Sequence, residues 1–285
     1  MQVINLDGRA AVLVDGGAID VAAASGGQFG PDPQSVYERW DAFRAWATPE
    51  TIESALAPVV AVDEALIGPP VPCPPQIFAI GLNYKDHAAE ANLDLPSQPM
   101  VFTKFPASVT GPYDAIGIPE GKVDWEVELV AVIGRKAERV PAGEAWSYVA
   151  GLTVGQDLSE RVLQTKSSNP PQYNLGKSYK GFAPIGPAVT TIDEFADPTD
   201  IAISCELNDV SMQRGRTSDT IFTIPQLIEY LSRVLPLLPG DLLFTGTPAG
   251  IGAARRPQVF IGPEDVLTTS AEGIGTMRNR FFSLS

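Results

Sequence analysis

The run DWEVELVAVIG, residues 124–134, constrains the fold of this chain more than any other stretch. In its first half acidic residues alternate with apolar ones. At the two-residue period of a β-strand, Asp124, Glu126 and Glu128 therefore share one face. The second half is continuously apolar, which is typical of a strand buried within a sheet. The pattern predicts a strand that carries three carboxylates to the edge of a buried core.

Three carboxylates at the end of a buried strand repel one another and resist transfer out of water. A hard cation would resolve this conflict, because Mg²⁺ takes carboxylate oxygens and keeps its other positions for water or substrate oxygens. The alternative is a strand whose polar face meets solvent and holds no ion. The spacing by itself leaves both interpretations open.

Composition limits the partners and the setting. The chain has 285 residues and a formal net charge of −14, so nucleic acid and anionic membranes are poor partners for its surface as a whole. No apolar run approaches the length of a membrane span. Cys73 and Cys205 are far apart and predict no disulfide framework. With no targeting segment recognised, we expect a reducing, cytoplasmic setting.

A proline-rich segment marks the predicted domain boundary. The segment PPVPCPP, residues 69–75, can be neither helix nor central strand, so we predict a small N-terminal α/β domain over residues 1–70 and a larger domain over residues 71–285. Hydrophobic spacing and turn residues predict the following elements of the first domain: strands at 2–6 and 10–14, and helices at 36–47 and 49–57.

The larger domain combines many short strands with few long helices. A helix is expected over residues 84–91, and another begins at Thr223 and buries Leu227, Ile228, Leu231, Val234 and Leu235. Besides the acidic strand, we predict strands at 77–81, 98–104, 149–154, 201–207 and 242–245. The fold class predicted is α+β and β-rich.

Several ordered segments resemble the fumarylacetoacetate hydrolase family. They are GLNYKDHAAE (81–90), the acidic strand, GQDLSERVLQ (155–164), GKS (176–178), Gly186-Pro187, PGDLLFTGTPAGIG (239–252) and EGIGTMRN (272–279). The resemblance covers roughly residues 75–282. It implies the family's mixed β-roll catalytic domain behind a small variable N-terminal domain, and a homodimer.

The resemblance assigns Glu126, Glu128 and Asp157 as metal ligands, of which the strand pattern had already indicated the first two. Asp124 is expected to support them from behind. Because all three ligands are oxygen donors, the expected ion is Mg²⁺, with Mn²⁺ or Ca²⁺ as alternatives.

His87 is the one histidine of the chain, and Glu90 follows it by three residues. In a helix the two side chains share a face, and a carboxylate beside an imidazole fixes its tautomer. The resemblance implies that this pair activates water and that its segment forms a ligand-ordered lid. The alternative is an incidental pair on a surface helix.

Further residues match family positions near the substrate. The resemblance implies substrate contacts for Arg161, Gln164 and Thr247, and it implies that Lys177 stabilises an enolate. Each could instead be an ordinary surface or turn residue. Lys104 is a weaker candidate for a contact with a substrate carboxylate.

The resemblance therefore predicts a metal-dependent hydrolase. Its substrate would be a 2,4-dioxo acid or a related 1,3-dicarbonyl, cleaved at a carbon–carbon bond to a 2-keto acid such as pyruvate and a second carboxylic acid. Two alternatives remain: a 2-keto acid decarboxylase or keto–enol isomerase on the same metal site, and a non-enzymatic protein that binds a metal or ligand. Val162 and Lys180 depart from residues common in the family, so no relative's substrate transfers directly.

Overall fold

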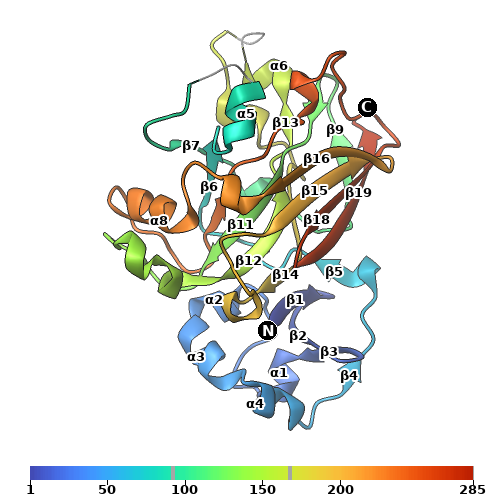
Figure 1. Ribbon diagram of the computed structural model, residues 1–285. Helices are drawn as coiled ribbons and strands as arrows, with labels where there is room; N and C mark the ends of the chain where they lie inside the picture. Colours follow the sequence, from blue (N-terminus) through green and yellow to red (C-terminus); the bar gives the residue numbers. More distant parts are fainter. Residues whose placement is uncertain (91–93, 166–168, 285) are drawn as a thin grey trace.

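Two β-sheets organise the computed structural model, which describes residues 1–90, 94–165 and 169–284 (Figure 1). Within these residues the larger, mixed sheet has twelve strands in the order β4-β3-β2-β1-β14-β12-β11-β17-β6-β7, with β5 beside β1 and β8 beside β14. Its strands are β1 (Gln2–Leu6), β2 (Arg9–Val14), β3 (Gly17–Asp20), β4 (Val59–Val60), β5 (Ile67–Gly68), β6 (Ile77–Gly81), β7 (Met100–Thr103), β8 (Val109–Thr110), β11 (Val127–Ile133), β12 (Val149–Gln156), β14 (Ala183–Thr190) and β17 (Leu242–Phe244).

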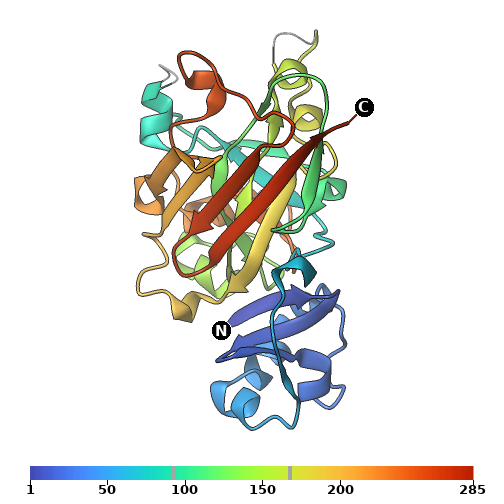
Figure 2. The same ribbon diagram turned by 90° about the vertical axis from the view of Figure 1, so that its right-hand side faces the viewer.

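The smaller sheet covers one side of the larger one, and Figure 2 shows it from its outer face. Its described strands follow the order β16-β15-β18-β19-β9, and a separate short ladder joins β10 to β13. These strands are β9 (Ala115–Ile118), β15 (Ala202–Leu207), β16 (Val210–Arg216), β18 (Val266–Ala271), β19 (Gly275–Ser283), β10 (Val123–Asp124) and β13 (Ser159–Glu160).

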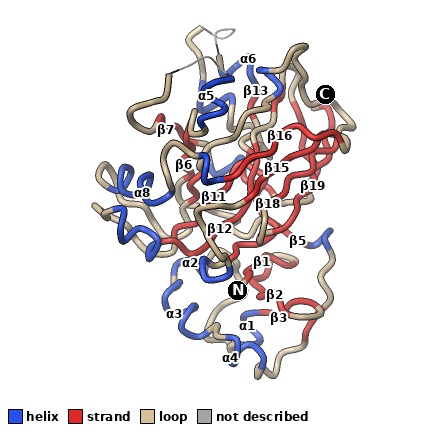
Figure 3. The backbone as a smooth tube through the Cα atoms, in the orientation of Figure 1, coloured by secondary structure: helices blue, strands red, loops and turns tan. Residues whose placement is uncertain are grey.

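Short helices surround the strands, as Figure 3 shows. The α-helices are α1 (Val21–Ala24), α2 (Ser35–Glu38), α3 (Trp40–Trp46), α4 (Pro49–Glu53), α5 (Lys85–Glu90), α6 (Arg161–Gln164), α7 (Tyr173–Gly176) and α8 (Ile224–Ser232). The 3₁₀ helices are η1 (Glu64–Leu66), η2 (Pro106–Ser108), η3 (Ala142–Tyr148), η4 (Ile192–Glu194), η5 (Thr217–Asp219) and η6 (Gly252–Ala254). The predicted β-rich α+β class is confirmed.

Strand β11 lies between two hydrophobic cores. Leu129 and Ala131 join the core shared with the smaller sheet. Val130 and Val132 point the other way, into a core that includes Trp40 of α3. Because both faces of the strand are covered, every residue of β11 is buried, as its continuous apolar run predicted.

The acidic stretch differs from the prediction in one respect. Instead of one strand over 124–134, Asp124 ends β10, which pairs with β13, and β11 begins only at Val127 and pairs with β12. Residues 125 and 126 connect the two, so Asp124 is separated from the acids that follow it.

The N-terminal strands belong to the same sheet as strands of the C-terminal part of the chain. Strand β1 pairs antiparallel with β14, so hydrogen bonds of the sheet cross the predicted boundary. Residues 69–75 form neither helix nor strand, as their prolines predicted. The division into a domain of residues 1–70 and a domain of residues 71–285 stays a prediction.

Several local expectations were wrong. The helix predicted over 36–47 breaks at Arg39, whose φ of −122° is not helical, and becomes α2 and α3. The helix after Thr223 ends at Ser232, so Val234 lies beyond it and is 77% exposed instead of buried. Both cysteines were expected at core or strand positions; Cys205 is buried in β15, but Cys73 is exposed in the proline-rich segment. The long strands β14, β18 and β19 were not predicted.

In the described part of the chain, no helix has the length and apolar character needed to cross a membrane. The cytoplasmic setting stays a prediction.

A buried carboxylate holds the turn that feeds β17 into the sheet. Asp241 accepts hydrogen bonds from the backbone N–H of Leu238 and from the Gln76 side chain, both at 2.7 Å. Burial raises the pKa of Asp241 to about 6, and these two hydrogen bonds oppose the rise. The charged form of this side chain therefore costs the folded state free energy at neutral pH.

The first prediction concerns Asp241→Asn. A folded-state pKa above the unfolded value makes this group's contribution to stability greatest at low pH and smaller as the pH rises from about 4 to 6. The variant should therefore gain stability relative to the wild type as the pH rises, by at most about 3 kcal/mol, at about 1.4 kcal/mol per pH unit. Urea unfolding at pH 4 and pH 8 measures the difference in unfolding free energy between the variant and the wild type. The same difference at both pH values would contradict the prediction.

Candidate active site

Three carboxylates meet where β11 and β12 run side by side. Glu126 precedes β11, Glu128 is its second residue, and Asp157 follows β12 directly. The antiparallel register pairs Val127 with Gln156, and the Asp157 N–H donates to the Glu126 carbonyl at 2.9 Å. Carboxylate oxygens of the three acids lie within 4.8 Å of one another, and all three side chains are buried. The structure thus brings together the three predicted metal ligands.

The pKa values of two of these carboxylates are shifted in opposite directions. Burial, together with Asp157 and Glu126, raises the pKa of Glu128 well above its usual value. Burial acts on Glu126 as well, but the nearby Lys177 and Arg161 outweigh it and hold the pKa of Glu126 below its usual value. Within the described part of the chain Glu128 forms no salt bridge, and Lys177 offsets its burial only in part, so a divalent ion would relieve the remaining cost of its charge.

Lys177 lies against two acids of the trio. Its Nζ is 2.7 Å from Oε2 of Glu126 and 2.5 Å from Oδ2 of Asp157. Burial alone would lower the pKa of this lysine, but Asp157 and Glu126 raise it above its usual value. The ammonium also lies 4.8 Å from the centroid of the Phe102 ring. Lys177 is therefore a charged group at the trio, as the resemblance required.

The sequence did not predict that Lys104 is buried at the carboxylate cluster. Lys104 is fully buried, and its Nζ lies 2.6 Å from Oδ1 of Asp157. It contacts the carboxylate cluster through Asp157, whereas the sequence suggested only a contact with a substrate carboxylate. Its position directly after β7 could have revealed it, because the acids of the trio also stand at strand ends.

Arg161 connects the trio to its surroundings. The guanidinium donates through Nε to Asp124 at 2.8 Å and lies 2.8 Å from Oε1 of Glu126. Its Nη1 donates to Oε1 of the buried Gln164 at 3.0 Å. Asp124 also accepts from the backbone N–H groups of residues 252 and 253, so it anchors Arg161 from behind the trio. These contacts bring together Arg161 and Gln164, the two predicted substrate-binding residues of α6.

The predicted proton-transfer pair forms on α5. Nδ1 of His87 lies 3.2 Å from Oε2 of Glu90, and Glu90 accepts the Gly250 N–H at 3.1 Å. The imidazole is near enough to Glu126 to contribute to the lowering of its pKa. Helices α5 and α6 both lie at the end of the molecule opposite the N-terminal helices (Figure 1). The predicted lid includes residues 91–93, which lie outside the described residues.

Thr247 has a structural hydrogen-bonding pattern. Its hydroxyl donates to the Val127 carbonyl at 2.8 Å and accepts from Nε2 of Gln213 at 2.8 Å. Gln213, which the sequence did not indicate, also accepts the Val127 N–H at 3.0 Å. The two side chains thus fix the start of β11 between the carboxylates of Glu126 and Glu128.

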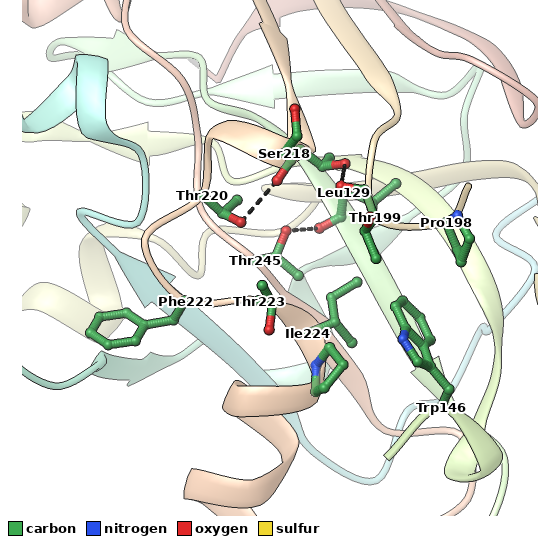
Figure 4. Close-up of a pocket in the computed structure, with 12 residues that line it drawn as sticks. Leu129, Trp146, Pro198, Thr199, Ser218, Thr220, Phe222, Thr223, Ile224 and Thr245 are labelled. Atoms are coloured by element: carbon green, nitrogen blue, oxygen red, sulfur yellow. Dashed lines mark hydrogen bonds between the residues drawn. The ribbon is translucent and has the colours of Figure 1, made fainter. Parts of the chain in front are cut away.

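A separate cavity of about 180 Å³ lies beside β11 and α8 (Figure 4). Its wall includes Leu129 and Thr245, whose hydroxyl donates to the Leu129 carbonyl at 2.8 Å. None of the predicted site residues lines it. The full lining is Leu129, Trp146, Pro198, Thr199, Thr217, Ser218, Thr220, Phe222, Thr223, Ile224, Pro225 and Thr245.

Comparison with known proteins decides the family. The model of the fumarylacetoacetate hydrolase C-terminal domain matches residues 76–282. The chain belongs to the fumarylacetoacetate hydrolase family. It is 40% identical to the mitochondrial oxaloacetate tautomerase Fahd2a of Rattus norvegicus over 229 residues, which are 80% of this chain and 72% of the relative.

Solved structures agree with this family assignment. A protein described as HpcE from Mycobacterium smegmatis is 48% identical, with a TM-score of 0.93 and full coverage of both chains. A maleylpyruvate hydrolase from Sphingobium sp. SYK-6, solved with manganese(II) and pyruvate, is 25% identical, with a TM-score of 0.81 over 99% of each chain. The family includes hydrolases and isomerases, and divalent-metal binding by this fold is supported.

The second prediction concerns Glu128→Gln. The neutral amide removes the carboxylate whose charge the metal-free fold disfavours, and it can still accept the Gly246 N–H that Glu128 accepts at 2.7 Å. Without metal, the variant should therefore melt at a higher temperature, by about 2–4 °C for each kcal/mol gained. Its affinity for Mg²⁺ or Mn²⁺ should fall at least about tenfold, because a ligand charge is lost. Thermal melts measure the stability and calorimetry measures the ion affinity. If the melting temperature and the affinity both rose, or both fell, the assignment of Glu128 as a metal ligand would be contradicted.

Proposed function

We propose that this chain is a divalent-metal-dependent enzyme that interconverts the keto and enol forms of a 2-keto dicarboxylic acid of the oxaloacetate type. The carrying observation is a buried cluster of three carboxylates in which Glu126 feels the charge of His87, itself paired with Glu90. Keto–enol conversion needs only enolate stabilisation and proton transfer, and this arrangement offers both. Relatives about 40% identical are oxaloacetate tautomerases, which supports this choice over hydrolysis.

The charges of the site suit an acidic substrate. Around the trio, the four carboxylates of Asp124, Glu126, Glu128 and Asp157 face the three cations of Lys104, Arg161 and Lys177. A divalent ion brings this cluster to a small positive net charge. A substrate carboxylate can then enter a buried site without meeting uncompensated negative charge.

In the mechanism, Glu126, Glu128 and Asp157 would hold the ion, which would polarise the 2-keto group and favour the enolate. Neutral His87, oriented by Glu90, removes a proton from the carbon next to that keto group and returns it to the enolate oxygen. Lys177 stabilises the negative charge on that oxygen between the two transfers. Proton removal and return balance, so no water is consumed.

Carbon–carbon hydrolysis is the second candidate. The same His87–Glu90 pair could take its proton from water, and the similarity to a maleylpyruvate hydrolase favours this reading. Mass analysis of 2,4-dioxo acids incubated with enzyme and Mn²⁺ separates the two: release of pyruvate with ¹⁸O from water in the second acid indicates hydrolysis. No cleavage, together with a faster approach to the keto–enol equilibrium followed by the ultraviolet absorbance of the enol, indicates the tautomerase.

The third prediction concerns His87→Ala. Loss of the general base should lower kcat for keto–enol conversion about 10²- to 10⁴-fold, with a smaller change in KM, because Arg161 and the metal still hold the substrate. The wild-type rate should fall at acid pH, since a protonated imidazole cannot accept the proton. Lys85→Ala, an exposed change on the same helix, serves as the control. Near-normal turnover by His87→Ala would remove its role.

We also propose that the active form is a homodimer that uses the edge of the larger sheet. Strand β7 forms that edge, and Met100, Val101 and Phe105 are 46%, 38% and 47% exposed. An unpaired edge strand with exposed apolar side chains favours association with another chain. Because β7 leads directly to Lys104, such a contact would lie close to the active site.

The fourth prediction tests this interface. Val101→Lys places a charge on the β7 edge and should shift the protein from dimer to monomer in light scattering at micromolar concentration. Val210→Lys, which adds the same charge at a remote exposed position of β16, should leave the mass unchanged. A wild-type monomer, or a dimer insensitive to Val101→Lys, contradicts this interface.

A further inference from the structure

Lys104 is a buried cation whose donors are all engaged. Its Nζ donates to Oδ1 of Asp157 at 2.6 Å, to the Leu158 carbonyl at 3.2 Å and to the Lys177 carbonyl. An ammonium has three donors, so these three acceptors satisfy it completely. No donor remains for a substrate, and the side chain is 0% exposed. Lys104 is therefore held inside the protein, and its bonds end on protein groups.

The two lysines of the cluster differ in what they contact. Lys177 donates to carboxylates and faces the rings of Phe102 and Tyr173. Lys104 instead joins one carboxylate to two backbone carbonyls from separate segments of the chain. Its bond to the Lys177 carbonyl holds the backbone of the lysine whose ammonium contacts Glu126 and Asp157. Lys104 thus links a metal ligand to the backbone of the catalytic lysine.

These bonds fix the orientation of Asp157. One carboxylate oxygen accepts from Lys104 and the other from Lys177, while the Asp157 backbone donates to Glu126. With both oxygens assigned, rotation about the side-chain bonds of Asp157 would break at least one charge-assisted hydrogen bond. Removing Lys104 frees one of the two restraints.

We propose that Lys104 is a positioning residue that fixes the Asp157 carboxylate and thereby makes the site discriminate between Mg²⁺ and Ca²⁺. Mg²⁺ demands near-ideal octahedral geometry at 2.0–2.1 Å, whereas Ca²⁺ accepts irregular oxygen ligands at 2.3–2.6 Å. A rigid carboxylate favours Mg²⁺ binding. A mobile carboxylate weakens the binding of Ca²⁺ less than it weakens the binding of Mg²⁺. This inference rests on the metal site of the proposed function.

The test compares two ions of equal charge. Metal-free wild type and Lys104→Met are titrated with Mg²⁺ and with Ca²⁺ in a calorimeter. Loss of a residue that orients a ligand typically weakens metal binding 10- to 100-fold. The Mg²⁺ dissociation constant should rise by about that factor. Its ratio to the Ca²⁺ dissociation constant should rise about tenfold, so that selectivity for Mg²⁺ falls. A merely electrostatic effect of Lys104 would change both constants by the same factor and leave the ratio unchanged.

A second variant and a control complete the experiment. Lys104→Arg keeps the charge but cannot reproduce the three-acceptor geometry, so its ratio should shift too, and it is measured in the same way if Lys104→Met does not fold. Lys136→Met, at a 59% exposed side chain, should retain the wild-type ratio. An unchanged ratio in either folded Lys104 variant overturns the inference alone. Failure of the wild type to bind either ion overturns both this inference and the proposed metal site.

Discussion

The mutual compensation of buried charges at the end of β11 and β12 is the constraint on which the site depends. An isolated carboxylate or ammonium in this interior would cost several kcal/mol. Asp157 and Glu126 avoid that cost by pairing with Lys104, Lys177 and Arg161. Glu128 forms no such ion pair with any described residue, and burial raises its pKa. The cluster is thus stable enough to fold and still favours an added cation.

The position of β11 between two cores makes this arrangement possible. Side chains of β11 pack on both sides, so the strand cannot shift in register without burying different residues on each face. Hydrogen bonds from Thr247 and Gln213 hold Val127, where the strand begins. The acids therefore sit on a rigid support, which is what metal binding and proton transfer with fixed geometry require.

The predicted proton-transfer pair, unlike the carboxylates at β11, lies on a short helix near the surface. His87 and Glu90 belong to a six-residue helix, and backbone N–H groups of residues 249 and 250 bind Asp86 and Glu90 of that helix. The loop that carries Thr247 thus contacts both the metal-ligand strand and α5. Helix α5 is thus joined to this loop by hydrogen bonds between exposed groups, while the trio stands on and beside a buried strand.

Local sequence patterns predicted much of the fold and of the candidate site of this protein. The period-two acids before an apolar run predicted a buried strand with Glu126 and Glu128 on one face, and the ordered motifs indicated the family and Asp157. The sequence did not reveal the break that separates Asp124 from the trio or the burial of Lys104. It also failed to predict the joining of β1 to β14. These depend on contacts between residues far apart in the chain, such as Lys104 with Asp157, and no local periodicity encodes such pairings. The sequence thus specified which groups were available, and tertiary packing decided which of them are buried together.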